Sequence, residues 1–289
     1  MKFAFSSNAF TRYSLAETIK ILAEIGYDGI EIMADVPHAY PLYFSDQDIL
    51  QTKKLLQETG IAISNVNAFM HNADGDTYHP SWIEKDEKER VRRIEYTLRC
   101  IDLAAQLGAG HISTEPGGPL EGVSRREGLQ FFREGLHAIE GRAKEKGIRI
   151  LIEPEPGLLV EKSSQFQELF ADLDPRVFGI NFDIGHFFCV GEDPAALVPI
   201  LKECASHFHV EDIAASRKHH HLKLGEGAID IPGVLDAIAE SGFSGFVTVE
   251  LYTCADEPEA AARDAFQYLQ SWKKARGHAE GAKGKAVSH

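Results

Sequence analysis

The feature that most constrains the fold is a regular alternation of two kinds of segment along the chain. Short runs rich in β-branched and aromatic residues are each followed by a longer stretch whose apolar residues recur every three or four positions. The first pattern is typical of strands and the second of amphipathic helices. Eight such strand–helix pairs follow one another, at residues 2–26, 28–60, 61–108, 110–147, 148–173, 177–205, 207–242 and 245–275.

Strands that alternate with helices pair in parallel, and eight units in about 275 residues match a single α/β domain of the (β/α)₈ TIM-barrel type. A doubly wound open sheet is the alternative, but it usually carries a glycine-rich phosphate-binding turn after its first strand. The segment SSNAFTRY (6–13) has no such turn. Segments 22–32 and 238–251 repeat the same helix end, turn and strand, which favours a closed, quasi-symmetric barrel.

We therefore predict one barrel domain over residues 1–276. Residues 277–289 lose the apolar periodicity, and we expect them to form a flexible C-terminal tail. Ser14, Ser45, Ser163 and Asp193 are the expected N-terminal caps of four helices.

The composition excludes several classes of protein. The net charge of −14 repels phosphate backbones, so we expect no nucleic-acid partner. The four cysteines are widely spread and form no C-x-x-C pair, which argues against a disulfide scaffold or a structural zinc site. The N-terminal segment lacks the apolar core of a signal peptide, and no run of 18 apolar residues occurs. We expect a soluble, cytoplasmic protein without a membrane partner.

Chemistry in such a barrel lies at the carboxyl ends of the strands. The fifth to eighth predicted strands end at or near Glu153, Asp183, His209 and Glu250. Each alone could be an ordinary polar residue at a strand end, but together they would bring three carboxylates to one point, where they repel one another unless a cation is present. A set of hard oxygens with one imidazole favours Mn²⁺, Mg²⁺ or Co²⁺, with Zn²⁺ possible and copper disfavoured.

Several motifs resemble those of one known group of proteins. The segments LIEPEP, NFDIGH, HFHVED followed by LGEGAIDIPGVLDAI, and GFVTVEL, taken in this order, resemble the xylose isomerase-like TIM-barrel superfamily. This superfamily of sugar isomerases and epimerases includes ketose 3-epimerases, hydroxypyruvate isomerase, inosose isomerases and dehydratases and, more distantly, endonuclease IV. The resemblance covers nearly the whole chain.

In that superfamily one divalent metal ion is bound by a residue at the end of each of strands five to eight. The matching residues here are Glu153, Asp183, His209 and Glu250. The resemblance also implies that His186 contacts the substrate and that Arg217 holds substrate oxygens. Glu155 is a further candidate for substrate binding, although a solvated loop carboxylate is an equal alternative.

The chemistry that the resemblance implies is proton transfer next to a carbonyl group, through a metal-stabilised cis-enediolate. Glu153 and Glu250 are the candidate catalytic pair: one removes the carbon-bound proton, and in an epimerase the other returns a proton to the opposite face. His186 is the third catalytic candidate and would hydrogen-bond the carbonyl oxygen.

We therefore expect an enzyme that isomerises or epimerises a sugar, ketose or polyol-ketone, with one divalent ion as cofactor. Mn²⁺ is the favoured ion, and Mg²⁺, Co²⁺ and Zn²⁺ are the alternatives. The partner is a small-molecule substrate, and a homodimer or homotetramer is left open.

At two positions the chain departs from the pattern of ketose 3-epimerases, which widens the range of reactions to consider. Ketose 3-epimerases typically place a Glu six residues after the strand-five Glu and an Arg six residues after the strand-seven His, where this chain has Leu159 and Ala215. A dehydratase, such as inosose or 3-dehydroshikimate dehydratase, is the alternative on the same site. An endonuclease IV-like nuclease is a remote alternative, because the net charge is wrong and the fourth strand, HISTEPGG, has no His at its carboxyl end.

Three further features bear on the site. Glu31 ends the second strand, where a structural hydrogen bond is slightly favoured over a position in the cavity. Gly185 is expected to form the turn that releases His186 toward the substrate. The tract RKHHH (217–221) looks like a metal-binding run, but a mobile loop between the seventh strand and its helix, of which one side chain could touch substrate, explains it better.

Overall fold

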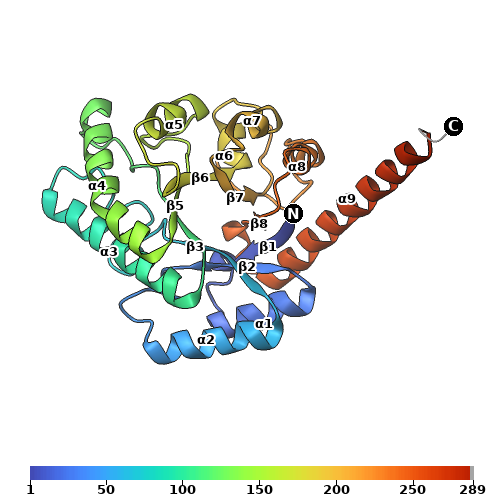
Figure 1. The fold of residues 1–289 in the computed structure, drawn as a ribbon, viewed down its shortest axis with the longest axis horizontal. Coiled ribbons are helices and arrows are strands. Elements are labelled where there is room, and N and C mark those ends of the chain that lie inside the picture. The colour runs from blue at the N-terminus through green and yellow to red at the C-terminus, as the bar shows by residue number, and fades with distance from the viewer. Residues whose placement is uncertain (287–289) are drawn as a thin grey trace.

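Eight parallel strands form a closed barrel in chain order, and β8 pairs with β1 to close it. The computed structural model describes the backbone of residues 1–286 and side chains as far as residue 277. The strands are β1 (Lys2–Ser6), β2 (Gly29–Met33), β3 (Ala62–Asn67), β4 (His111–Thr114), β5 (Arg149–Ile152), β6 (Phe178–Asp183), β7 (Ala205–Val210) and β8 (Phe246–Val249). Figure 1 shows the ring of strands in the middle of the molecule with helices around it, so the predicted (β/α)₈ barrel is confirmed.

The helices connect successive strands on the outside of the barrel. They are α1 (Leu15–Ile25), α2 (Asp46–Thr59), α3 (Glu87–Leu107), α4 (Arg125–Lys146), α5 (Ser163–Phe170), α6 (Ile184–Cys189), α7 (Pro194–Leu201), α8 (Ile231–Glu240) and α9 (Pro258–Ala286), with 3₁₀ helices η1 (Ser7–Ala9) and η2 (Tyr252–Cys254). No helix of the described residues is long and apolar enough to cross a membrane.

Local chemistry sets where the helices begin and end. The Ser14 side chain accepts a hydrogen bond from the Glu17 amide, and the Glu17 side chain accepts one from the Ser14 amide, which starts α1. Gly26 ends α1 with φ 107°, a left-handed conformation that side chains disfavour. Ser163 is not the cap that we predicted: it is the first residue of α5, and Lys162 precedes it.

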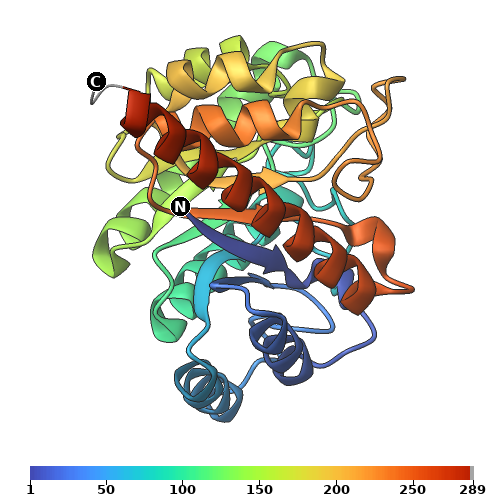
Figure 2. The same ribbon diagram turned by 90° about the vertical axis from the view of Figure 1, so that its right-hand side faces the viewer.

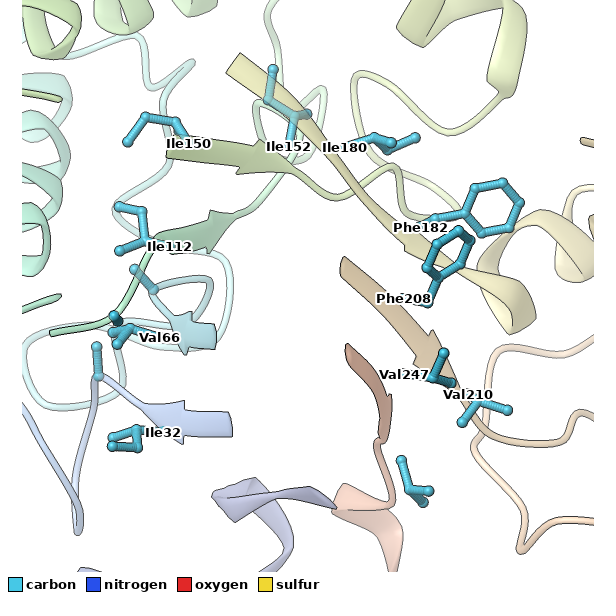
Figure 3. Close-up of a cluster of buried hydrophobic side chains, with 14 of the residues drawn as sticks. Ile32, Val66, Ile112, Ile150, Ile152, Ile180, Phe182, Phe208, Val210 and Val247 are labelled. Atoms are coloured by element: carbon cyan, nitrogen blue, oxygen red, sulfur yellow. The ribbon is translucent and has the colours of Figure 1, made fainter. Parts of the chain in front are cut away.

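Side chains alternate between the two faces of each strand. Figure 3 shows Ile112, Ile150, Phe182 and Phe208 among the hydrophobic side chains on the strands, which lie toward the outside of the ring. These side chains pack against the helices and form the main core. The intervening residues face the barrel axis, and many of them are polar. The interior of the barrel therefore holds buried polar and ionisable side chains.

Helix α9 lies obliquely across the outside of the barrel (Figure 2), where the ring of Trp272 meets that of Phe3 edge to face at a centroid distance of 6.2 Å. It continues to Ala286, beyond residue 276, where we expected the barrel domain to end. Ala, Glu and Lys are good helix formers, so a helix needs no apolar periodicity there. The flexibility expected of residues 277–289 stays a prediction, and residues 287–289 lie outside the described part of the chain.

Candidate metal centre

Four strand ends meet at one rim of the barrel. Asp183 ends β6, His209 is the penultimate residue of β7, and Glu153 and Glu250 follow β5 and β8 directly. One ligand atom from each of the four side chains lies within 4.8 Å of the other three. All four residues are buried, and Glu250 is the most exposed of them at 6%. The structure therefore brings together the four side chains that the sequence singled out.

The His209 ring lies in the middle of this group. Its Nδ1 is 2.9 Å from Glu153 Oε1, 3.5 Å from Glu250 Oε2 and 3.7 Å from Asp183 Oδ2. Its Nε2 is 2.8 Å from Glu31 Oε2. An ionised carboxylate only accepts hydrogen bonds, so we assign a proton to Nε2, which leaves Nδ1 directed at the three carboxylates. Hydrogen bonds of this kind orient metal-binding imidazoles.

Glu31 is held by several donors inside the barrel. Ser6 Oγ donates to it at 2.7 Å, Asn65 Nδ2 at 2.9 Å and Asn67 Nδ2 at 3.3 Å. Burial raises the pKa of the Glu31 carboxyl, but the facing His209 more than offsets this and leaves the pKa below its ordinary value. Glu31 thus makes the expected structural hydrogen bonds, and through His209 it also orients the centre.

Buried oxygen atoms without partners mark the same place. Glu153 Oε2, Asp183 Oδ2 and Glu211 Oε2 have no hydrogen-bond partner among the described residues. Leaving a buried acceptor unpaired costs about 1–3 kcal/mol, and more for a charged group. A divalent cation among these oxygens would offset that cost and the mutual repulsion of the carboxylates. With three carboxylates and one imidazole, the residues present fit Mn²⁺, Mg²⁺, Co²⁺ or Zn²⁺.

The ionisable groups of the centre differ in pKa. Burial raises the pKa of Glu153, and it raises the pKa of Glu250 well above the ordinary value. Burial also raises the pKa of Asp183, but the neighbouring imidazoles, foremost His186, leave it lowered overall. For His209, burial lowers the pKa, yet the surrounding carboxylates raise it well above the ordinary value. Burial therefore favours the protonated form of both Glu153 and Glu250.

A cavity of about 380 Å³ opens above the centre. Polar residues that line it include Asn8, Asn67, Glu153, Glu155, His186, His219 and Glu250, and less polar ones include Met33, Val36, Phe69, Met70, Tyr78 and Tyr252. A larger hollow of about 440 Å³ lies beside α1 and α2, but none of the four strand-end residues lines it. We therefore take the cavity at the carboxyl ends of the strands as the functional one.

His186 reaches the cavity from a helix, not from a glycine turn. Strand β6 ends at Asp183, whose Oδ1 accepts the His186 amide at 2.7 Å and so caps helix α6. The predicted turn at Gly185 is wrong, because Gly185 is helical. His186 Nδ1 lies 2.9 Å from the carbonyl oxygen of Pro154, so we assign its proton to Nδ1. Burial lowers the pKa of His186, and the neutral ring then presents Nε2 to the cavity as an acceptor.

Glu211 is a buried residue of the site that the sequence analysis missed. Its Oε1 accepts the Gly185 amide at 2.6 Å, and a Cβ at position 185 would lie only 2.1 Å from that oxygen. Glycine is required there by this close approach. The available signal was its position directly after β7, two residues beyond the expected ligand His209.

The two remaining substrate-binding candidates lie in different places. Glu155 is only 4% exposed and accepts a 2.7 Å hydrogen bond from Tyr78 Oη, so the alternative of a solvated loop carboxylate is wrong. Burial raises the pKa of Glu155 to about 8. Arg217 is exposed, and its guanidinium lies 4.2 Å from the centre of the Phe188 ring. Arg217 does not line the cavity, so the structure does not bring it to the other candidates.

The tract 217–221 sends two histidines inward. His219 lines the cavity and His221 is only 1% exposed, whereas His220 is exposed. His219 Nε2 lies 3.0 Å from His186 Nε2 and 3.2 Å from His221 Nε2. Two side chains of this loop, two positions apart, therefore point inward, and the expected substrate contact of one of them stays a prediction.

Residues 19–272 match the family model described as xylose isomerase-like TIM barrel, and the chain belongs to this family. It is similar to the uncharacterized protein MJ1311 of Methanocaldococcus jannaschii, with 30% identity over 262 residues, 86% of this chain and 83% of that protein. Fructoselysine 3-epimerase of Shigella flexneri is 25% identical over 267 residues, 90% of this chain and 94% of that enzyme. The solved structure of a D-tagatose 3-epimerase-like protein matches with a TM-score of 0.81 and 26% identity, over 96% of this chain and 99% of that one.

Proposed function

We propose that this protein is a divalent-metal-dependent epimerase or isomerase of a sugar, ketose or polyol-ketone. The observation that carries the proposal is the buried group of Glu153, Asp183, His209 and Glu250, in which two carboxylate oxygens lack any partner among the described residues. The similarity to fructoselysine 3-epimerase supports the reaction class.

In this proposal the four residues hold one divalent ion, and the oxygen-rich ligand set favours Mn²⁺. The ion, when bound, would polarise the substrate carbonyl and stabilise the negative charge of a cis-enediolate. Glu153 and Glu250 stand on β5 and β8, three strands apart around the barrel, and both line the cavity. One takes the proton from the carbon next to the carbonyl, and the other gives a proton to the opposite face.

The chain's other polar residues position these groups. Asn8 Nδ2 donates to Glu250 Oε1 at 2.8 Å, which fixes one oxygen of that carboxylate and leaves Oε2 for proton transfer. His186 offers an acceptor at Nε2, so it suits a substrate hydroxyl better than the carbonyl oxygen that we expected it to contact.

The cavity favours an uncharged substrate. The described residues that line it include no Lys or Arg, but they include three carboxylates, Glu153, Glu155 and Glu250. A phosphate group would meet carboxylates without a compensating cationic side chain, so we propose that the substrate is unphosphorylated. Met33, Phe69 and Met70 provide an apolar surface for the less polar part of the molecule.

The test is a panel of ketoses, inososes and their phosphorylated counterparts, incubated with the Mn²⁺-loaded protein in D₂O and followed by NMR. We expect deuterium to enter the recovered sugar next to the carbonyl, without loss of water, and only for unphosphorylated compounds. A new enone absorbance would instead identify a dehydratase. Glu153→Gln should abolish the exchange, and normal metal binding together with full turnover in this variant would contradict the assignment.

A further inference from the structure

Asn8 is a buried residue of the cavity, and only one of its two amide atoms has a partner. The residue lines the cavity and is only 4% exposed. Its Nδ2 donates to Glu250 Oε1 at 2.8 Å, whereas its Oδ1 has no hydrogen-bond partner among the described residues. A buried acceptor without a partner lowers the stability of the protein. A ligand that donates a hydrogen bond to Oδ1 would remove this loss.

The orientation of the Asn8 amide follows from its neighbour. The oxygen and the nitrogen of a side-chain amide are told apart by their hydrogen bonds. As a metal ligand Glu250 is ionised, and an ionised carboxylate only accepts. The nitrogen of Asn8 must therefore face Glu250, and the oxygen is the atom left for a ligand.

The backbone around Asn8 is held in place by the barrel. Asn8 is the middle residue of η1, which follows β1 directly, and all three residues of this short helix are buried. The Ser6 side chain accepts a hydrogen bond from the Asn8 amide and caps the helix. Ser7 Oγ accepts the Met33 amide at 2.9 Å, which ties η1 to β2. The acceptor of Asn8 is therefore presented from rigid elements, as selective binding requires.

We propose that Asn8 is a substrate-binding residue that selects compounds with a free hydroxyl next to the two oxygens of the enediolate. We call the group of Glu153, Asp183, His209 and Glu250 the four-residue centre. The inference rests on the proposed function, in which this centre takes the carbonyl oxygen and the neighbouring hydroxyl. The hydroxyls left for other protein groups are then those on the adjoining carbons. Because the Asn8 amide is bonded to Glu250, its Oδ1 lies beside a proposed proton-transfer group, where such a hydroxyl can donate to it.

Asn67 lines the same cavity and provides a comparison. Its Oδ1 accepts the Phe69 amide at 3.0 Å, and its Nδ2 donates to Glu31 Oε1 at 3.3 Å. Both amide atoms of Asn67 therefore have partners within the protein, and no ligand is needed to satisfy them. The difference between the two residues points to Asn8 as the amide that binds substrate.

The free acceptor also defines which compounds the site should reject. A site that hydrogen-bonds a substrate hydroxyl discriminates strongly against an analogue without it, because the buried polar group is then left unpaired. A methyl ether or a carboxylate at the same position would bring only acceptors to Asn8 Oδ1. The substrate class is therefore a polyhydroxy ketone whose hydroxyl next to the reacting pair is unsubstituted.

The test combines one change in the protein with one change in the substrate. The probes are D-fructose, D-tagatose and D-psicose, each compared with its 1-deoxy and 4-deoxy analogues, which lack one hydroxyl next to the enediolate oxygens. Calorimetry with the Mn²⁺-loaded protein measures binding, and NMR in D₂O measures exchange. In the wild type we expect one of the two deletions to weaken binding and kcat/KM about 10–100-fold. In Asn8→Leu the same deletion should change both by less than about threefold.

Asn67→Leu is the matched control, because it removes an amide from the same cavity. We expect each hydroxyl deletion to have the same effect in this variant as in the wild type. Asn8→Leu also removes the hydrogen bond to Glu250, but this loss affects both members of each substrate pair equally and cancels in the comparison. Unfolding curves show whether each variant is folded, and Asn8→Ala replaces Asn8→Leu if the larger side chain prevents folding.

The outcomes separate the two proposals. Deuterium exchange in which the hydroxyl deletions act equally on the wild type and Asn8→Leu overturns the role of Asn8 and leaves the proposed function intact. A difference in binding without exchange into any ketose overturns the proposed function and leaves Asn8 as a binding residue. A fall in Mn²⁺ affinity in Asn8→Leu as large as that in Asp183→Asn would mean that Oδ1 serves the ion, which overturns the inference. Absence of binding by every probe overturns both proposals.

Discussion

Two polar layers inside this barrel differ in whether their buried polar atoms have hydrogen-bond partners. In the inner layer, His207 Nδ1 pairs with Asn181 Oδ1 at 2.8 Å and His207 Nε2 pairs with Thr248 Oγ1 at 2.7 Å. Thr248 in turn donates to Ser64 Oγ at 3.1 Å, and none of these side chains has a buried polar atom without a partner. One step further along the same strands lies the mouth, formed by the four-residue centre and Glu211, where three buried oxygens lack partners.

The comparison teaches that polarity within a barrel does not by itself mark a functional site. Both layers are buried and both contain histidines. The inner layer saturates its donors and acceptors within the protein and so contributes to specifying the fold. The mouth has buried oxygen acceptors without hydrogen-bond partners. They lower the stability of the protein, and a bound cation can offset this loss. Three of the following four predictions test this division, and one concerns Glu115, a buried carboxyl outside both layers; the largest expected effect comes first.

Glu250→Gln should separate activity from stability. We expect turnover to fall by about 10³-fold, because a proton-transfer group at the mouth is lost. In the presence of a chelator the free energy of unfolding should stay constant or rise, because burial disfavours ionisation of the Glu250 carboxyl and the neutral amide removes that cost. Turnover with Mn²⁺ and urea unfolding with chelator measure the two effects. A large loss of stability would show that Glu250 stabilises the fold, as the residues of the inner layer do.

Glu115 is a buried carboxyl outside both layers, and it makes stability depend on pH. Burial raises its pKa to about 7, although Arg93 Nε lies 3.7 Å away. Because the folded-state pKa exceeds the unfolded value of 4.5, the folded protein holds the proton longer. Stability should therefore fall as the pH rises from 4.5 to 7 and then level off, by about 3 kcal/mol in total.

The measurement for Glu115 is the difference in unfolding free energy between the wild type and Glu115→Gln across this pH range. The comparison with Gln removes the titration of the mouth, which both proteins share. A difference that does not change with pH would mean that Arg93 keeps Glu115 ionised in the folded protein.

Glu31→Gln tests the link between the two layers, since Glu31 Oε2 lies 3.9 Å from His207 Nδ1 in the inner layer and 2.8 Å from His209 Nε2 at the mouth. The amide still fills the space but no longer holds the Nε2 proton of His209 with a charged acceptor. We expect Mn²⁺ affinity to fall about 10–100-fold, with a small change in stability. Metal titration by calorimetry measures this, and unchanged affinity would show that His209 is oriented without Glu31.

Thr248→Val is the smallest change and belongs to the inner layer alone. The substitution keeps the shape but removes the hydrogen-bond partner of Ser64 Oγ and of His207 Nε2. We expect the free energy of unfolding to fall by about 1–2 kcal/mol and Mn²⁺ affinity to stay the same. A change in affinity larger than the change in stability would show that the layers are not independent.

The sequence predicted the architecture because the alternation of strands and helices persists around the whole barrel. The four strand-end residues were found for the same reason: parallel strands bring their carboxyl ends together. Their role as metal ligands stays a prediction. Glu211 was overlooked because it lies directly after the end of β7, and nothing in the sequence shows that its carboxylate accepts the amide of Gly185, 26 positions away.

Loop positions were the least predictable from sequence. Arg217 was chosen for its charge, yet it has φ 59° and turns its side chain onto Phe188. His219 and His221 are turned inward by contacts distant in sequence, such as that of His221 with the Glu250 carbonyl. Helix α6 begins directly at the end of β6 because the Asp183 side chain caps it, so one carboxylate both ends a strand and starts a helix.

The close approach of Gly185 and Glu211, 26 positions apart, has a use beyond this molecule. With a Cβ only 2.1 Å from the carboxylate, any larger residue at the first position is incompatible with a glutamate held this way at the second. Glycine and glutamate at these two positions therefore form a linked signature for sorting related sequences. Relatives that carry both the glycine and the glutamate should share the buried carboxylate at this mouth and its stabilisation by a cation. Those with a bulkier first residue must place that charge elsewhere or do without it.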